Sequence, residues 1–101
     1  ANPKNNPLVL IITTLFRYFL NLLTYHYQKK TTPNTQEMAR LLGVHPFFMK
    51  DYIDGGKIYN AMKCATTISL LREYDMKSKG VGNANISDGE LLKELIFKIM
   101  H

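Results

Sequence analysis

The sequence predicts an all-α protein, a bundle of five helices. Apolar residues recur at three- and four-residue spacing along most of the 101 residues. No segment shows sustained alternation of apolar and polar residues, and no Asn-Gly or Asp-Gly turn lies between β-branched runs, so we expect almost no sheet. Capping residues, prolines and glycines divide the chain into five helical segments.

The first helix is expected from Pro7 to about Gln28, with Asn6 as its N-cap and Pro7 at the tolerant first position. Its polar residues recur at intervals of three or four and form one narrow stripe, and apolar residues cover the remaining helix surface. This pattern is typical of a bundle helix with one solvent-exposed side. The stripe holds Thr13, Thr14, Arg17, Asn21, Thr24 and Gln28, and the apolar positions are Leu8, Ile11, Ile12, Leu15, Phe19, Leu22 and Leu23.

A transmembrane helix is an alternative interpretation of the segment from Leu8 to Tyr27, because this segment is mostly apolar and long enough to cross a bilayer. The polar stripe argues against it. Arg17 near the midpoint would cost roughly 2.5–3.5 kcal/mol on insertion scales. No second apolar run follows. We therefore expect no membrane partner.

The second helix is expected to start after Asn34, which can cap it with Glu37 in the reciprocal position. Gly43 supplies a left-handed stop, and Val44 can pack back across that stop. The expected apolar face consists of Met38, Leu41 and Leu42.

A short third helix is expected from Pro46 to about Asp54, ended by Gly55 and Gly56. Its aromatic face would comprise Phe47, Phe48, Tyr52 and Ile53.

The fourth helix is expected from roughly Asn60 to Lys77, ended by Gly80, Gly82, Asn83 and Asn85. Its apolar side would hold Met62, Ala65 and Ile68, widened by Leu70, Leu71 and Tyr74. The fifth helix follows a capping box of Ser87 and Glu90. Its apolar stripe would be Leu91, Leu92, Leu95, Ile96 and Ile99.

Length and composition bound the chain to one small domain. Hydrophobic residues make up 46% and charged residues 21%, which is ordinary for a globular protein. A chain of this length buries only around two thirds of its unfolded surface. We expect residues 1–101 to form a single helical domain. Because the chain starts at Ala1 without a Met or a signal peptide, we interpret it as an excised C-terminal piece of a longer subunit.

Charge and cysteine content narrow the function classes only slightly. Thirteen Lys and Arg against eight Asp and Glu give a net charge of +5, which suits an acidic partner but is common in proteins that never contact DNA. Cys64 is the only cysteine, so neither an intrachain disulfide nor a Cys-x-x-Cys zinc pair can form. These features favour the cytoplasm over secretion.

The sequence lacks the residue combinations that catalytic and cofactor-binding sites require. His26, His45 and His101 lie far apart without a metal-ligand spacing, and Cys64 has no His at a spacing that would activate it. There is no phosphate-binding Gly-x-x-x-x-Gly-Lys-Ser/Thr motif. We expect no catalytic residue, cofactor or metal.

The segment from Gln36 to Tyr52 has the residue pattern of a helix-turn-helix corner. It has a small residue at Ala39, a bend at Gly43, and Met49 and Tyr52 at positions that would face inward. A recognition helix needs exposed Arg, Lys, Asn or Gln side chains that can match base edges. The second helix here offers instead Pro46, Phe47, Phe48, Lys50, Asp51 and Asp54. We favour a corner that packs, and keep a DNA-binding domain as the alternative.

Several side chains are candidates for a subunit interface or for proximity to DNA. Phe47 and Phe48 are adjacent, so a helix can bury both only between neighbours or against another chain; core packing is the more common outcome. The cluster of Arg72, Lys77 and Lys79 could meet a phosphate or an acidic partner, although most such clusters are simply solvated. The complete candidate set is Arg17, Phe47, Phe48, Tyr52, Arg72, Lys77 and Lys79.

Two motifs carry a resemblance to a known family. They are Ala-Arg-Leu-Leu-Gly-Val-His-Pro-Phe-Phe-Met-Lys at 39–50 and Leu-Leu-Arg-Glu-Tyr-Asp-Met-Lys-Ser-Lys-Gly at 70–80, after an apolar first helix that follows Asn-Pro. Together they resemble the C-terminal domain of the delta subunit of the bacterial DNA polymerase III clamp loader, over nearly the whole chain. One departure is the segment from Asp54 to Lys57, where relatives tend to have an Ala- and Arg-rich helix, so the third helix is expected to be cut short.

The resemblance implies an all-helical collar domain without a working ATPase, an oligomerisation module that joins the corresponding domains of delta-prime and gamma or tau type subunits in a ring. The sliding clamp would be bound by an N-terminal domain that is missing here, and DNA only by the full complex. As a hypothesis, this domain assembles the loader that places the clamp on primed DNA during DNA replication. Its docking surfaces are expected first on exposed faces of the first and last helices, because terminal helices of a small bundle keep one side free.

Overall fold

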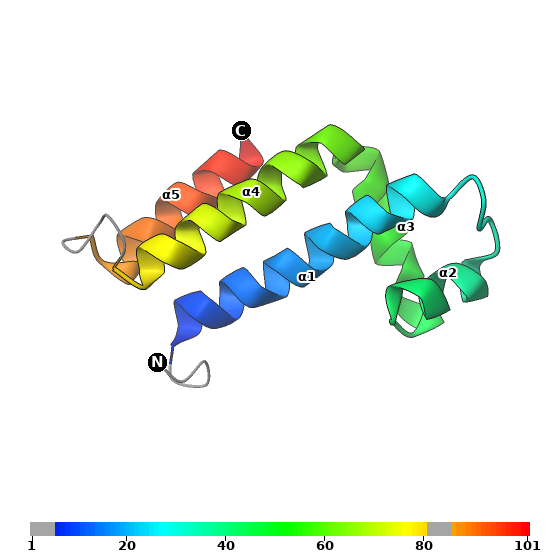
Figure 1. Ribbon diagram of the computed structural model, residues 1–101, viewed down its shortest axis with the longest axis horizontal. Coiled ribbons are helices and arrows are strands. Elements are labelled where there is room, and N and C mark those ends of the chain that lie inside the picture. The colour runs from blue at the N-terminus through cyan, green and yellow to red at the C-terminus, as the bar shows by residue number, and fades with distance from the viewer. Residues whose placement is uncertain (1–5, 81–85) are drawn as a thin grey trace. The chain divides into compact units, whose positions relative to one another are not determined.

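The computed structural model describes residues 6–80 and 86–101. Every regular element within them is helical (Figure 1). The five α-helices and one 3-10 turn are α1 (Pro7–Gln28), α2 (Thr35–Leu42), η2 (Pro46–Phe48), α3 (Met49–Ile58), α4 (Ala61–Ser78) and α5 (Asp88–Met100). The prediction of an all-α chain with five helices is confirmed.

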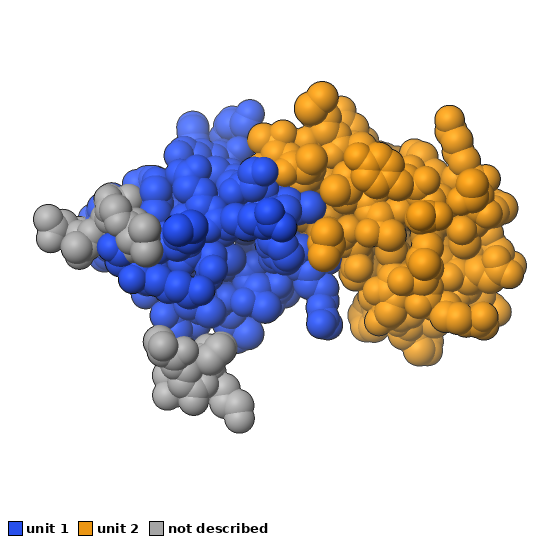
Figure 2. Space-filling view, in the orientation of Figure 1, with its two compact units in different colours: residues 1–17, 67–101 blue, residues 18–66 orange. Residues whose placement is uncertain are grey.

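Contacts between residues divide the chain into two compact units, coloured separately in Figure 2. Unit 1 comprises residues 1–17 and 67–101, and unit 2 comprises residues 18–66. Helices α1 and α4 each contribute residues to both units.

The core of unit 1 is built by the first half of α1, most of α4 and α5. Tyr74 is fully buried in this core and donates its hydroxyl to Glu94 Oε1 at 2.8 Å. The other buried apolar side chains of the unit are Leu8, Ile12, Ile68, Leu71, Leu91, Leu95 and Ile99, and the buried polar one is Thr67. Burial stabilises the fold by about 1.5–3 kcal/mol for each large apolar side chain.

The core of unit 2 joins the second half of α1 to α2, α3 and the start of α4. Tyr18 stacks on Tyr52, with ring centroids 5.1 Å apart, and donates its hydroxyl to the carbonyl of Asp51 at 3.2 Å. The remaining buried side chains are Phe19, Leu22, Met38, Ala39, Leu42, Met49 and Cys64. Met49 and Tyr52 therefore face inward, as the corner pattern predicted.

The predicted helix ends are largely confirmed by their caps. Asn6 accepts from the Val9 amide at 3.2 Å, Asn34 from the Glu37 amide at 3.0 Å and Ser87 from the Glu90 amide at 3.2 Å. Gly43, at φ 71°, lets the Val44 amide reach the Ala39 carbonyl at 2.9 Å, which closes α2 as expected. Gly80, at φ 87°, follows α4, whereas Gly82, Asn83 and Asn85 lie outside the described residues.

The predicted end of the third helix is wrong, because Gly55 and Gly56 lie inside α3, which continues to Ile58. The cause is close packing against α1. A Cβ on Gly55 would collide with the Tyr18 hydroxyl, and one on Gly56 would approach Tyr25 Cε2 to 3.0 Å. The two glycines therefore let two helices approach each other rather than ending one of them. The expectation that this helix is cut short at the departure from the family pattern is also wrong.

Three predicted apolar faces need correction as well. On α4 the buried positions are Cys64, Thr67, Ile68, Leu71 and Tyr74, while Met62 and Ala65 are exposed. Leu41 on α2 and Ile96 on α5 are exposed rather than buried. In each helix the predicted buried face was too broad or was rotated about the helix axis. Helical spacing identifies the apolar residues, but it does not show which of them contact the neighbouring helix.

Helix α1 is long and apolar enough to cross a membrane by length and composition, with a mean hydropathy of 1.6. Core helices of soluble proteins pass the same test, so the match is weak evidence. Only 22% of this segment is buried by the described chain, and Arg17 is exposed. The expectation that the chain has no membrane partner stays a prediction.

Candidate interaction surfaces

Exposed apolar side chains are the most prominent surface feature of the described chain. Twelve large hydrophobic residues are exposed: Leu10, Leu20, Tyr27, Leu41, Phe47, Phe48, Ile58, Met62, Met76, Ile96, Phe97 and Met100. Scattered exposed apolar residues are normal in soluble proteins, whereas those that gather on one face mark interaction sites. Two groups gather in this way, one on α5 in unit 1 and one at the α2–η2 corner in unit 2.

Helix α5 carries two apolar stripes side by side. Leu91, Leu95 and Ile99 recur every four residues and are buried in the core of unit 1. The next residue after each, displaced by about 100° around the helix, is also apolar. The second stripe therefore consists of Leu92, Ile96 and Met100. Leu92 is half-buried, whereas Ile96 is 41% exposed and Met100 is 68% exposed, so the C-terminal part of this stripe is open to solvent.

A shallow, open hollow of about 490 Å³ lies over this second stripe, formed by residues of α5 and its C-cap. We call it the α5 groove; it is lined by Gly89, Leu92, Lys93, Ile96, Phe97, Met100 and His101. Phe97 forms one wall, 64% exposed and stacked on the His101 ring with centroids 4.4 Å apart. A Cβ on Gly89 would meet no atom within 4 Å, so the helix backbone is accessible at the N-terminal end of the groove.

Lys93 is the one ammonium group that lines the α5 groove, and it has no ion pair within the described residues. The other charged groups of the middle of α5 are engaged elsewhere. Lys98 lies over the Tyr74 ring at 5.2 Å, and Glu94 accepts from the hydroxyl of the same tyrosine. A hydrogen bond to Tyr74 raises the pKa of Lys98. The α5 groove is therefore apolar with a single positive charge.

The second group, which we call the corner surface, comprises Phe47 and Phe48 of η2. The two phenyl rings meet edge to face with centroids 5.4 Å apart, and they are 79% and 50% exposed. The expectation that these rings pack in the core is therefore wrong. His45 caps the turn by accepting the Phe47 amide on Nδ1 at 3.0 Å, and Met49 is the first buried residue after the turn. Because η2 precedes α3, both rings come before the first core position.

The helix after the corner presents little that could read DNA. Lys50 Nζ lies 2.7 Å from Asp54 Oδ2, and both side chains are exposed. This hydrogen bond raises the pKa of Lys50 and lowers the pKa of Asp54. Asp51 is also exposed. Two acidic residues within one turn of Lys50 are unfavourable beside phosphates.

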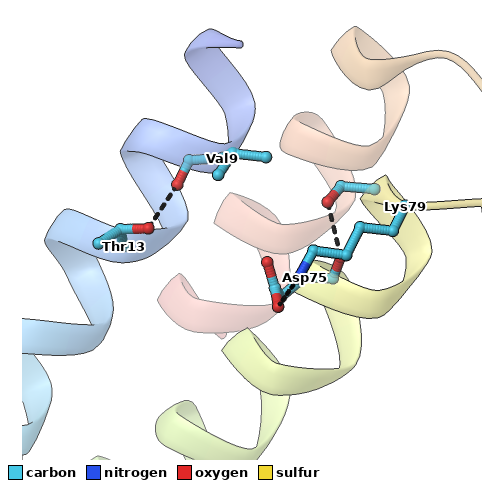
Figure 3. Close-up of polar contacts among 5 residues, drawn as sticks. Val9, Thr13, Asp75 and Lys79 are labelled. Atoms are coloured by element: carbon cyan, nitrogen blue, oxygen red, sulfur yellow. Dashed lines mark hydrogen bonds and ion pairs between the residues drawn. The ribbon is translucent and has the colours of Figure 1, made fainter. Parts of the chain in front are cut away.

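The predicted basic cluster is largely neutralised within α4. Lys77 Nζ lies 3.0 Å from Glu73 and 4.6 Å from the Tyr74 ring centroid. Lys79 Nζ lies 3.0 Å from Asp75, a pair drawn in Figure 3 beside the hydrogen bond from Thr13 to Val9. Each carboxylate precedes its lysine by one turn, so the pairs follow the local helix geometry.

The remaining predicted site residues are Arg72, Arg17 and Tyr52. Arg72 lies over the Phe16 ring, 5.7 Å from its centroid, and helps to line a smaller groove of about 270 Å³. Arg17 is exposed on α1. Tyr52 is 7% exposed and its hydroxyl accepts from Asn21 at 3.3 Å, so it is a core residue and offers no ring to a partner. Of this set, Phe47 and Phe48 touch each other directly, and Arg72 and Lys79 share the neighbouring carboxylate Asp75.

The described residues 6–80 and 86–101 hold no group of three or more His, Cys, Asp or Glu side chains that could bind a metal ion. Cys64 is fully buried, and its burial raises the pKa of the thiol. Its Sγ lies 3.8 Å from the Tyr59 carbonyl, to which it donates. A buried, protonated thiol is a poor nucleophile.

Sequence reasoning missed Phe97 and Met100 and placed Ile96 in the core. A signal was present. Seven of the thirteen α5 residues are large and apolar, namely Leu91, Leu92, Leu95, Ile96, Phe97, Ile99 and Met100. One core-facing stripe of a three-turn helix needs only about half of them, so the surplus indicates a second face.

No protein-family model, no curated protein and no solved structure matches this chain.

Proposed function

We propose that this chain is a non-catalytic assembly domain, which holds its parent protein in a larger complex through apolar helix faces. The observation that carries the proposal is the α5 groove, where Ile96, Phe97 and Met100 are exposed along one face of a helix whose other face is already in the core. Apolar residues with an aromatic and a Met at the centre are the composition of protein–protein interface cores.

The corner surface supports the same proposal from the other unit. Two exposed phenyl rings in edge-to-face contact supply rigid apolar area at low cost in side-chain entropy, which is what an interface anchor requires. Core packing does not account for them, since Met49 and Tyr52 fill the core positions of this corner.

The complex that we propose is a clamp loader, in which this chain would be the collar domain of the delta-type subunit. Two observations support this proposal: the pair of motifs at 39–50 and 70–80, and an all-helical fold with exposed apolar surfaces on which partner subunits would dock. The partners would be the delta-prime and gamma or tau type subunits. The sliding clamp and DNA would be bound by other parts of the assembled loader.

Co-purification tests this proposal directly. The full-length parent protein, with and without residues 1–101, would be mixed with the other loader subunits and resolved by size-exclusion chromatography. The expected result is a stable complex that is lost only in the truncated form. A complex that forms equally well without residues 1–101 would contradict the proposal.

A DNA-binding domain of the helix-turn-helix type is the alternative, favoured by the Gly43 corner and the net charge of +5. Affinity for duplex DNA measured at low and moderate salt separates the two functions. Weak binding that falls steeply with salt would reflect charge alone and is compatible with an assembly domain. Tight, sequence-selective binding by this chain would establish the alternative instead.

A further inference from the structure

We propose that a pocket inside unit 2 binds a small organic carboxylate whose apolar part has the size of a single six-membered ring. The pocket has a volume of about 170 Å³ and lies where the end of α1, the connection after it, α2 and α3 meet. All of its lining residues belong to unit 2. We call it the methionine pocket, because Met38 and Met49 line it. The inference goes beyond the proposed assembly function and does not depend on it.

The methionine pocket reaches the core of unit 2. Met38 of α2 and Met49 of α3 line it, although each is only 2% exposed. A ligand that enters the pocket therefore contacts core side chains, and its apolar surface is removed from water. Thioether side chains are flexible, so they adapt to the shape of an apolar ligand, and they make favourable contacts with aromatic rings.

One wall of the pocket is an aromatic ring that is already held in place. Tyr25 lines the pocket, and a Cβ on Gly56 would come within 3.0 Å of Tyr25 Cε2, so the ring lies against the backbone of α3. Its centroid is 5.8 Å from that of the His26 ring, whose Nε2 lies 2.7 Å from the Tyr59 carbonyl oxygen. A ring that is fixed in this way loses little freedom when a ligand binds beside it, which lowers the entropic cost of binding.

The volume of the pocket sets the size of the ligand. An apolar cavity of about 150 Å³ accommodates benzene. The methionine pocket is of similar volume, and Pro33 and Ile53 complete its apolar lining. It therefore has room for one such ring and not for a larger fused system.

Charge beside the pocket selects a carboxylate. Lys29 lines the pocket and is exposed, its Nζ lies 5.9 Å from the centroid of the Tyr25 ring, and it has no ion pair within residues 6–80 and 86–101. The other polar lining residues, Thr32 and Thr35, are uncharged, and no acidic residue is among those that line the pocket. A ligand ring seated against Tyr25 brings a carboxylate on a short linker within reach of the ammonium group, whereas a cationic ligand is repelled.

Methionine NMR of the 101-residue chain tests this inference. The probe is phenylacetate, and phenylacetamide is its uncharged analogue of the same shape. Isotope-labelled methionine methyl groups report binding at the pocket itself, since Met38 and Met49 line it and Met62, Met76 and Met100 are exposed outside it. We expect saturable shifts of the two pocket methyl groups alone. The expected dissociation constant of phenylacetate is about 1 mM, as for other ligands of roughly ten non-hydrogen atoms. Phenylacetamide should bind about threefold more weakly, because it lacks the ion pair.

Two adjacent lysines supply a matched pair of variants. Lys29→Gln should weaken phenylacetate binding about threefold and leave phenylacetamide binding unchanged. Lys30→Gln, at an exposed residue outside the pocket, should leave both affinities unchanged. Ile53→Trp fills the pocket and should abolish the binding of both compounds. Circular dichroism verifies that each variant folds, and if Ile53→Trp does not, the comparison of Lys29→Gln with Lys30→Gln decides the question.

Four results would overturn the inference. They are the absence of saturable shifts at Met38 and Met49 well above the expected dissociation constant, shifts of similar size at all five methionines, equal affinity for the acid and the amide, and unchanged phenylacetate affinity in Lys29→Gln. None of them bears on the assembly function, which co-purification tests separately.

Discussion

At the scale of single residues, Gly55 shows how one missing side chain sets the distance between two helices. Its α-carbon faces the hydroxyl of Tyr18, which is fixed by stacking on Tyr52 and by its hydrogen bond to the Asp51 carbonyl. Because the ring has little freedom to move, an added methyl group forces α3 away from α1 or breaks that hydrogen bond.

Gly55→Ala is therefore expected to destabilise the chain. Overpacking costs roughly 1–3 kcal/mol, and the better helix propensity of Ala returns up to about 1 kcal/mol, so we expect a net loss of about 1–2 kcal/mol. Urea unfolding followed by circular dichroism measures the change. Adding Tyr18→Phe removes the colliding hydroxyl and should restore part of the loss.

Gly89→Ala is the matched control, because Gly89 is also helical but faces open space. This substitution should be neutral or stabilising by up to about 1 kcal/mol. Equal effects at Gly55 and Gly89 would mean that helix propensity alone governs both positions, and that α3 and α1 are not in close contact.

The Cys64 thiol gives a second prediction at this scale. Burial raises its pKa, so at pH 8 less thiolate is present in the folded chain than in the unfolded chain, and reagent access is blocked as well. We expect Cys64 to react with a disulfide reagent at least about a hundredfold more slowly in the native chain than in 6 M guanidinium. Rapid labelling of the native chain would show that α4 opens readily at this position.

Single residues also show what sequence can and cannot predict. The caps at Asn6, Asn34 and Ser87 were predictable because a cap depends on residues within three positions along the chain. The role of Gly55 was not predictable, since a glycine that ends a helix and a glycine that admits a neighbour look identical until the neighbour is placed.

At the scale of elements, α5 is the helix whose two faces differ most in their surroundings. Leu95 is fully buried against unit 1, whereas its neighbour Ile96 is 41% exposed in the α5 groove. The two residues have the same volume and adjoin in sequence, so their substitution separates core packing from surface character.

Leu95→Ala should cost about 2–5 kcal/mol, because it removes a buried side chain and leaves a cavity. Ile96→Ala should cost less than about 1 kcal/mol in the isolated chain, because much of that side chain already contacts water. Thermal unfolding of both variants measures the difference. Similar losses at the two positions would mean that the outer stripe is covered, either by this chain or by a second copy.

The extents of the helices were largely predictable, and their orientations only in part. Helix α1 begins and ends where its caps and composition indicated, and α4 shifts by a single residue at each end. The apolar arcs of α4 and α5 are wider than one contact face. Which flank enters the core depends on the crossing of neighbouring helices, which is a tertiary property that periodicity does not contain.

At the scale of the whole molecule, exposed large apolar residues form a group in each of the two units. The α5 groove and the corner surface belong to different units; the first combines Phe97 with aliphatic side chains, and the second consists of two phenyl rings. The corner surface involves two residues that the sequence singled out, Phe47 and Phe48, for which core packing was expected. The last helix was expected to carry a docking face, but the residues of the α5 groove were not identified, because Leu92 and Ile96 were assigned to the core stripe and Phe97 and Met100 were not singled out.

The paired lysines of α4 yield a prediction about DNA. Glu73 and Asp75 offset Lys77 and Lys79 within the helix, so the net charge of +5 is not concentrated there. The double variant Lys77→Gln/Lys79→Gln should change the affinity of the isolated chain for duplex DNA by less than about threefold at 150 mM salt. A loss of tenfold or more would place the two lysines in a DNA interface and favour the alternative function.

Complex formation by a variant with a charged α5 groove tests the assembly function most directly. The double variant Phe97→Glu/Met100→Glu replaces two exposed side chains, so its stability should stay within about 1 kcal/mol of the parent chain. Met76→Glu, at an exposed residue of α4 outside both surfaces, is the matched control. Sedimentation velocity of each full-length variant with the other loader subunits should show an intact complex for the parent protein and for Met76→Glu, and free subunits for the double variant. An intact complex with all three proteins would contradict a docking role for the last helix.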